Sequence, residues 1–600
     1  MREVRAGRNR RVVERFRAGR RREGERVAHE FRVWAPERER VELVLGERRL
    51  PMRRSSGGWW ERAVADAGPG TDYAYALDGG PPRPDPRSPY QPRGPHGPSR
   101  LVDHAAFPWS DDGWRGTPLP GAVLYELHVG TFSPAGTFDG VIERLPHLAE
   151  LGVDAIELMP VAEFSGRRGW GYDGVSLYAP HHAYGGPDGL KRLVDACHAH
   201  GLGVVMDVVY NHLGPSGNYL PQFGPYFTGR HTTNWGDGVN FDGPGSGEVR
   251  SFVIDNALMW LRDYHCDGLR LDAVHAIADD SAAHLLEQLA EEVAELSAHV
   301  RRPLFLIAES DLNDPRFVRP REAGGYGLDA AWADEWHHAL HAALTGERDG
   351  YYSEFGPLTL LAKALRQAWV YDGTWSPHRG RVHGRSPAGL PGHRFVVCAQ
   401  NHDQVGNRAQ GERAPALMSE GRLRVAAALL LTAPFTPMLF QGEEWGATTP
   451  FQYFTDHEDP ELGRAVSEGR RREFAGFGWE PEQVPDPQDP ATFERSRLDW
   501  SEPGKESHAR LLAWHRELIA LRRRVPALTD GRLDRVRAGC DEEAGLVTVE
   551  RGPVLVAANL GGRARTVPGR RRLLAASDPG ITLSGTDLTL PPDTVAILED

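Results

Sequence analysis

The sequence predicts an α/β protein whose central fold is a (β/α)8 barrel, with one β-sandwich domain before it and another after it. Three observations lead to this prediction. The chain of 600 residues is too long for a single hydrophobic core. Its middle part alternates apolar, strand-like runs with stretches of helical spacing. Both flanks instead show short β-rich segments that are separated by glycine and proline.

The N-terminal part divides into a charged tail and a β-rich region. Residues 1–27 carry 11 arginines, a block that is typical either of a solvated, disordered segment or of a basic arm for an acidic partner. We expect disorder there. Residues 28–110 contain short apolar segments broken by turn residues, which predict an antiparallel sandwich and then an extended linker at 81–99. The predicted strands are residues 31–34, 41–45, 59–64 and 71–77.

Residues 111–528 contain eight strand-like runs with helical patterns between them. Leu145, Leu148 and Leu151 have the spacing of one helix face and predict a helix over residues 138–152. Strand–helix units of this number predict a closed parallel barrel, and an open doubly wound sheet is the alternative. The other predicted helices are 189–200 and 248–265. The predicted strands are residues 123–129, 153–159, 203–209, 268–272, 304–309, 328–334, 395–401 and 437–441.

The chain returns to a β-rich pattern after a helix predicted at 509–524. Segments of apolar and β-branched residues predict a C-terminal sandwich over residues 529–600. The predicted strands are residues 545–551, 553–559, 571–576 and 581–590.

Composition argues against several classes of function. The net charge of −13 argues against nucleic-acid binding, which favours a basic surface. No apolar run is long enough to cross a bilayer, and none follows the charged start as in a signal peptide, so we expect no membrane partner. The four cysteines form no CxxC pair, which indicates neither a zinc site nor a disulfide framework and favours a cytoplasmic location. They are Cys197, Cys266, Cys398 and Cys540.

Polar side chains follow four of the predicted barrel strands. In a (β/α)8 barrel the C-terminal ends of the strands form the active site. One carboxylate there is often only a helix cap, but several from separate strands predict a shared site. These residues are Asp207, Asn211, His212, Arg270, Asp272, His275, Glu309, Gln400, Asn401, His402 and Asp403.

Two of these carboxyl groups have environments that suit different roles. Arg270 and Asp272 are two residues apart on one strand, so they share a face, and the arginine favours the ionised carboxylate that a nucleophile needs. Glu309 follows an apolar run, where desolvation favours the protonated form that a general acid needs. Retaining glycoside hydrolysis requires this division of labour between two carboxyl groups.

Four segments, in chain order, resemble the signature regions of the α-amylase superfamily: residues 207–212, 268–272, 308–309 and 401–403. The resemblance implies that Asp272 is the nucleophile, that Glu309 is the acid/base, and that Asp403 grips sugar hydroxyls and stabilises the transition state. It further implies that Arg270 orients Asp272. The remaining contacts that it implies to the same sugar ring are stacking by Tyr172 and hydrogen bonds from His212 and His402.

Longer stretches are similar to one branch of that superfamily, the maltooligosyl trehalose trehalohydrolases. They are residues 271–277, 308–314, 332–341, 400–408 and 441–446. This resemblance implies hydrolysis of the α-1,4 bond next to the terminal trehalose of maltooligosyl trehalose. It adds further substrate-binding residues: Ala273, His275, Asp311, Asp334, Glu335, His337, His338, Asn401 and Gln404. Residues 334–338 are alternatively a cluster that caps a helix.

The same resemblance implies partners and no cofactor. The expected ligands are maltooligosyl trehalose and malto-oligosaccharides, and the expected functional partner is a maltooligosyl trehalose synthase. The N-terminal sandwich is similar to a carbohydrate-binding module. Asn211 aligns with a calcium-ligand position of some amylases, but one amide without nearby carboxylates makes no calcium cage, so no metal is expected.

Two alternatives stay open at this point. A glucan branching or debranching enzyme of the same superfamily has the same domain order, although branching enzymes usually have Ser-His-Asp-Glu where residues 401–404 read Asn-His-Asp-Gln. A non-catalytic glucan-binding protein with an inactive barrel is the alternative from another class. The intact set of Asp272, Glu309 and Asp403 argues against it.

Overall fold

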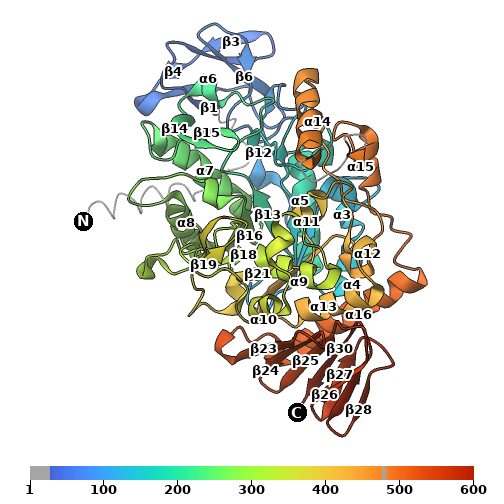
Figure 1. Cartoon of the computed structure of the whole chain (residues 1–600). Coiled ribbons are helices and arrows are strands. Elements are labelled where there is room, and N and C mark those ends of the chain that lie inside the picture. The colour runs from blue at the N-terminus through green and yellow to red at the C-terminus, as the bar shows by residue number, and fades with distance from the viewer. Residues whose placement is uncertain (1–27, 476–479, 481–482) are drawn as a thin grey trace.

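A computed structural model describes residues 28–475, 480 and 483–600. The prediction of a disordered tail at residues 1–27 lies outside the described residues. Figure 1 shows three parts in chain order: small N-terminal sheets at the top, a barrel with its helices in the middle, and a C-terminal sandwich at the bottom.

Eight parallel strands close into a barrel. The last strand in the sequence pairs with the first, Met438 lying opposite Leu124, so an open doubly wound sheet is excluded and the predicted barrel is confirmed. Each of the eight predicted runs overlaps one barrel strand, and the predicted and observed ends agree within three residues. In order around the barrel, the strands are β9 (Leu124–Leu127), β10 (Ala155–Leu158), β13 (Gly203–Val208), β16 (Gly268–Leu271), β17 (Phe305–Ala308), β18 (Ala330–Trp332), β21 (Phe395–Cys398) and β22 (Thr436–Phe440).

The barrel interior is apolar at one end and polar at the other. Leu124, Ala155 and Val205 belong to one buried apolar cluster inside the barrel. Because side chains alternate along a strand, the residues two positions further face the interior again. Those residues are Glu126, Glu157 and Asp207. All eight strands run in the same direction, so this polar layer lies toward their C-terminal ends.

Helices surround the barrel, and the main ones are α5 (Gly186–Ala199), α7 (Ser246–Arg262), α8 (Leu285–Val300), α9 (Asp334–Thr345), α10 (Leu358–Gln367), α13 (Glu420–Leu431) and α16 (Glu506–Arg524). The prediction of one helix over residues 138–152 is wrong, because the structure has α3 (Phe138–Ile142) and α4 (Leu145–Leu151). Pro146 lies in the first turn of α4, where a missing N–H costs nothing, whereas inside a longer helix it would break a hydrogen bond. Within the described part of the chain, no helix is long and apolar enough to cross a membrane.

The N-terminal part has two sheets. One contains β1 (His29–Trp34), β5 (Trp59–Val64) and β4 (Arg53–Arg54), and the other contains β3 (Arg48–Pro51), β2 (Val41–Leu45), β6 (Asp72–Leu77) and β7 (Pro82–Arg83). The following linker is held on the barrel by Arg87, whose Nη1 donates to Tyr178 Oη at 2.8 Å and to Asp255 Oδ2 at 3.0 Å.

The C-terminal part is also a two-sheet sandwich. Its first sheet has the order β23 (Val536–Asp541), β24 (Leu546–Arg551), β25 (Val554–Asn559), β30 (Thr594–Glu599) and β27 (Arg572–Ala576). Its second sheet has the order β26 (Arg565–Pro568), β29 (Asp587–Leu590) and β28 (Thr582–Ser584). The predicted single strand at 581–590 is therefore wrong. Gly585, with a φ of 62°, starts a turn that folds this segment into a hairpin.

Candidate active site

A buried arginine organises the carboxyl groups at the strand ends. The side chain of Arg270 is 0% exposed, and its Nη1 donates to Asp207 Oδ1 and Oδ2 at 2.9 and 2.8 Å and to Asp272 Oδ1 at 2.9 Å. Its Nη2 lies 3.7 Å from Glu309 Oε2. The guanidinium also lies 4.3 Å from the ring centroid of Trp332. One cation on β16 thus joins carboxyl groups from three adjacent strands.

Asp272 is held by two donors. Besides Arg270, Asn211 Nδ2 donates to Asp272 Oδ2 at 2.7 Å and to its backbone oxygen at 2.8 Å. Hydrogen bonds to a charged carboxylate are short and directional. The two donors therefore fix the orientation of the Asp272 carboxyl group. Asn211 follows β13 in the sequence, so this bond also connects two neighbouring strands.

Glu309 differs from Asp272 in its surroundings. Burial raises the pKa of Glu309 to about 8, the cation of Arg270 opposes this rise, and nearby carboxylates such as Asp272 and Asp403 add to it. A carboxyl group with this pKa keeps its proton at neutral pH and is able to act as an acid. Its Oε2 accepts a hydrogen bond from the backbone N–H of Ala273. Ala273 has a φ of 39°, an uncommon conformation for a residue with a side chain, and this turn directs its N–H at Glu309.

Residues on the opposite wall of the barrel form a second hydrogen-bond network. His402 Nδ1 lies 2.5 Å from Glu126 Oε1, and its Nε2 lies 2.8 Å from Tyr172 Oη. Tyr172 Oη in turn donates to Asp207 Oδ2 at 2.7 Å. Burial by itself lowers the pKa of His402, but the carboxylates of Asp403 and Glu126 outweigh it and raise this pKa to about 9. Both ring nitrogens of the imidazolium are therefore donors, and Tyr172 receives one hydrogen bond and gives one.

An aromatic pair flanks the site. The rings of His212 and Trp235 are stacked, with centroids 4.5 Å apart and planes within 2°. His212 Nδ1 lies 2.5 Å from Asn211 Oδ1, and its Nε2 lies 3.1 Å from the backbone oxygen of Tyr172. Trp235 is 49% exposed and lies between the two strands of the hairpin β14 (Phe227–Thr233) and β15 (Gly236–Val239). An exposed indole beside a buried polar network is a suitable surface for a sugar ring.

The predicted cluster at residues 334–338 divides into two groups. Asp334 lies near Glu309 and Asp403, and burial raises its pKa to about 7, with Asp403 adding to the rise. The other three are buried in contacts within the protein. Glu335 accepts hydrogen bonds from two backbone N–H groups, at residues 370 and 371, both at 2.7 Å. His337 Nδ1 lies 2.8 Å from the backbone oxygen of residue 399, and His338 packs against the ring of Tyr351.

The remaining predicted residues have varied surroundings. Asn401 caps α11 (His402–Gly406), because its Oδ1 accepts a hydrogen bond from Gln404 N at 2.8 Å. Gln404 Oε1 accepts from Tyr351 Oη at 3.2 Å. The side chain of Asp403 is 40% exposed, while His275 and Asp311 are exposed.

Three residues of this site were not among those predicted from the sequence: Glu126, Trp332 and Trp235. Glu126 had a usable signal, since it lies two positions after Leu124 on the first strand and therefore shares the inward face of the barrel. Asn211 was predicted at a strand end, but its hydrogen bonds to Asp272 were not. Nothing in the local sequence distinguishes Trp235 from a core tryptophan.

Two groups among the described residues have metal-ligand chemistry: Glu163 with His181 and His182, and His231 with Asp242 and Asp280. In the first group Glu163 Oε1 lies 2.9 and 2.8 Å from the two imidazole Nδ1 atoms. In the second group His231 Nε2 lies 2.8 Å from Asp242 Oδ2, and Arg230 supplies a cation 3.8 Å from Asp242 Oδ1. The carboxylates in both groups are thus hydrogen-bonded to side chains of the protein.

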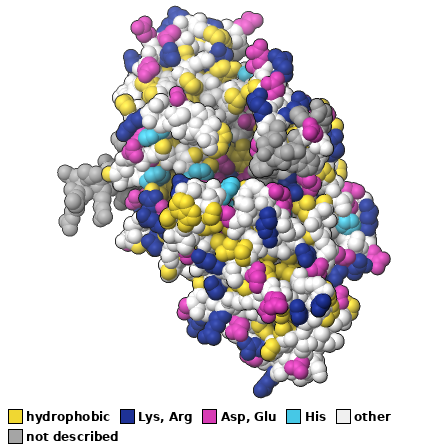
Figure 2. Space-filling view, viewed as in Figure 1, with side chains coloured by type: hydrophobic (Ala, Val, Ile, Leu, Met, Phe, Trp, Pro, Cys, Tyr) yellow, Lys and Arg dark blue, Asp and Glu magenta, His cyan; other side chains and the backbone are white. Residues whose placement is uncertain are grey.

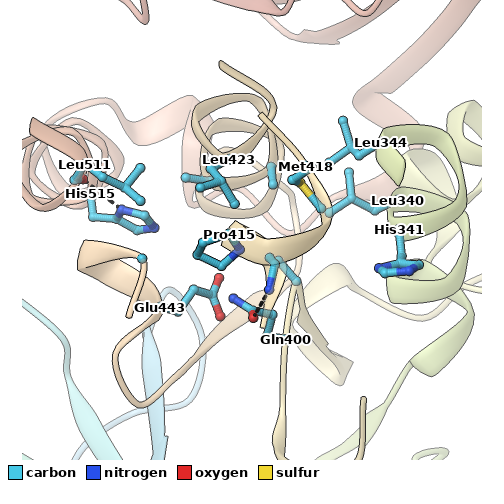
Figure 3. Close-up of a pocket in the computed structure, with 15 residues that line it drawn as sticks. Leu340, His341, Leu344, Gln400, Pro415, Met418, Leu423, Glu443, Leu511 and His515 are labelled. Carbon is cyan, nitrogen blue, oxygen red and sulfur yellow. Dashed lines mark hydrogen bonds between the residues drawn. The ribbon is translucent and has the colours of Figure 1, made fainter. Parts of the chain in front are cut away.

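A small cavity lies apart from the carboxyl groups. Figure 3 shows it between α9, α13 and α16, with mainly aliphatic side chains around it and the polar groups of Gln400 and Glu443 at one side. Gln400 Oε1 accepts a hydrogen bond from Ala414 N at 2.9 Å. The cavity contains none of the residues around Arg270. Figure 2 shows one face of the molecule, and histidine side chains lie across the middle of it.

The barrel and its carboxyl groups define a class of enzyme. The family model of the α-amylase catalytic domain matches residues 107–223, and that of carbohydrate-binding module 48, the isoamylase N-terminal domain, matches residues 19–90. The fold agrees with a crystal structure from Salmonella typhimurium that is described as an alpha amylase, at 40% identity and a TM-score of 0.89 over 96% of this chain and 98% of that one. The chain is therefore a glycoside hydrolase of the α-amylase superfamily.

Full-length relatives narrow this assignment. The malto-oligosyltrehalose trehalohydrolase of Arthrobacter ramosus is 58% identical over 88% of this chain and 92% of its own length. The protein of the same name from Rhizobium sp. is 51% identical over 96% of this chain and 98% of its own length. The chain belongs to the malto-oligosyltrehalose trehalohydrolase family.

Proposed function

We propose that the protein hydrolyses the α-1,4-glucosidic bond next to the terminal trehalose of maltooligosyl trehalose and releases trehalose. The arrangement of Asp272 and Glu309 around buried Arg270 carries this proposal, because it separates an anchored carboxylate from a proton-bearing carboxyl group. The names of the family members support the substrate. A glucan branching or debranching activity has no comparable support among these relatives.

The reaction we propose has two displacement steps and retains the configuration. In the first step an oxygen of Asp272 attacks the anomeric carbon, and Glu309 gives its proton to the glycosidic oxygen, so trehalose leaves. In the second step the Glu309 carboxylate takes a proton from water, and the water oxygen attacks the anomeric carbon, so the bond from this carbon to Asp272 breaks. Asp272 is released as a carboxylate and Glu309 is protonated again. This mechanism requires about 5–5.5 Å between the two carboxyl groups.

The residues around the cleaved bond have roles in binding. We propose that Asp403 holds hydroxyl groups of the sugar whose bond breaks and that Tyr172 supplies a ring for stacking. The imidazolium of His402, whose two N–H groups donate to Glu126 and Tyr172, holds Tyr172 in place beside that sugar. His212 contacts the same sugar. We propose that the trehalose side is formed by Ala273, His275, Asp311, Asp334 and Gln404. Four further residues hold loops and helix ends next to this site and do not contact the sugar themselves: Glu335, His337, His338 and Asn401.

We also propose a setting for the reaction. Maltooligosyl trehalose must be made by a synthase that forms the terminal trehalose linkage on a malto-oligosaccharide, and both enzymes act in the cytoplasm. We propose domain boundaries near residues 110 and 528, with residues 28–110 as the carbohydrate-binding unit. The match of residues 19–90 to carbohydrate-binding module 48 supports this division.

A product analysis tests the proposed function. The enzyme is incubated in parallel with maltotriosyl trehalose and with maltopentaose, and the products are separated by chromatography. Free trehalose and maltotriose from the first substrate are the expected result. New branches on amylose would instead indicate a branching enzyme, and the absence of any product from either sugar would indicate a glucan-binding protein. Asp272→Asn serves as the inactive control.

A further inference from the structure

One carboxyl group inside the barrel has no described partner and no role in the proposed reaction. Glu157 lies on β10, is 1% exposed, and neither of its carboxyl oxygens makes a hydrogen bond among the described residues. Buried carboxyl groups in proteins nearly always have partners. The position of Glu157 below the catalytic residues therefore requires an explanation.

The charged neighbours of Glu157 lie on β9, β13, β16 and α11. On β9 its partner in register is Glu126, and on β13 Asp207 is its close carboxylate neighbour. Two cations also act on it, Arg270 from β16 and His402 from α11. Their hydrogen bonds, however, go to other groups: Arg270 donates to Asp207 and Asp272, and His402 to Glu126 and Tyr172.

This environment disfavours a negative charge on Glu157. An ionised carboxylate without hydrogen bonds is costly in a protein interior, and two adjacent carboxylates increase the cost. Burial raises the pKa of Glu157 well above its ordinary value, and Glu126 and Asp207 raise it further. In its protonated form the side chain is a hydrogen-bond donor, and its nearest carboxylate neighbours are acceptors.

We propose that Glu157 is a positioning residue that carries a proton and stabilises the carboxylate of Glu126. Glu126 in turn keeps His402 in place. The place of Glu157 in catalysis rests on the proposed function, but its protonation does not. The side chain of glutamine also donates a hydrogen bond and carries no charge, so it can replace Glu157. Methionine has a similar size but no donor, so it cannot.

The first test is thermal unfolding of Glu157→Gln and wild type between pH 5 and pH 8. The unfolded chain has Glu157 ionised above about pH 5, whereas the folded chain keeps its proton, so wild-type stability falls as the pH rises. Glu157→Gln removes this loss. We expect its Tm relative to wild type to rise by about 3 °C over this range. Glu47→Gln, at an exposed turn, is the matched control and should show no change. A difference that stays flat or falls with pH overturns the proposal.

The second test measures activity. Glu157→Gln should keep kcat within about threefold and leave the pH profile unchanged, while Glu157→Met should lose about tenfold in kcat with little change in KM. Equal losses in both variants would show that Glu157 acts as a charged counter-ion and would overturn the proposal. The unfolding test needs no substrate, so it remains decisive even if the protein does not release trehalose.

Discussion

The pH dependence of catalysis tests the role of Glu309 most directly. Its pKa of about 8 means that the proton needed by the leaving group is lost as the pH rises through this value. About nine-tenths of the molecules hold the proton at pH 7, and about one-tenth hold it at pH 9, so kcat/KM should fall about tenfold between these values. Glu309→Gln removes the proton donor and should lower kcat/KM at pH 7 by about 10²–10⁴-fold.

The assay follows trehalose release from maltotriosyl trehalose between pH 6 and pH 10, for wild type and for Glu309→Gln, with thermal unfolding at each pH as a check on folding. In the variant the fall above pH 8 should disappear, because its residual rate no longer depends on this proton. An identical alkaline limb in both proteins would refute the assignment of the acid. A wild-type rate that stays constant up to pH 10 would refute the reasoning about burial.

Three further predictions concern the nucleophile, its arginine and the substrate. Asp272→Asn should reduce kcat by about 10⁴-fold or more with an unchanged circular dichroism spectrum, and near-normal turnover would contradict its role as nucleophile. Arg270→Met removes the cation that faces two buried carboxyl groups, so denaturant unfolding should show a loss of about 3–5 kcal/mol, whereas exposed Arg464→Met should show almost none. The value of kcat/KM for maltotriosyl trehalose should exceed that for maltopentaose by about 10²-fold, since a site that hydrogen-bonds trehalose hydroxyls leaves polar groups unpaired with another sugar. Equal values would identify an ordinary amylase.

The barrel could be predicted because its signals are local. Each barrel strand is a short apolar run between turn or helix signals, and the alternation along a strand places Arg270 and Asp272 on one face before any tertiary contact is known. Helix continuity was harder to predict. The spacing of Leu145, Leu148 and Leu151 suited one long helix, but Pro146 favours a new helix start, and the chain follows the proline.

The candidate site could be predicted only in part. The carboxyl groups at the strand ends were found from the sequence, since parallel strands bring their C-terminal ends together. The contacts of Glu335 were not, because its partners are backbone N–H groups at residues 370 and 371, in a separate segment. A polar residue that holds a loop and one that binds substrate look the same in a sequence.

By itself, the sequence determined which residue types stand at the ends of the strands and which family they resemble. Only the tertiary structure decided their partners and their charges. Glu126 meets His402 across 276 positions of the chain, and Asp272 meets Asn211 across 61. The proton on Glu309, the proton on His402 and the isolation of Glu157 all depend on burial and on the distance between charges, and closure of the barrel sets both at once.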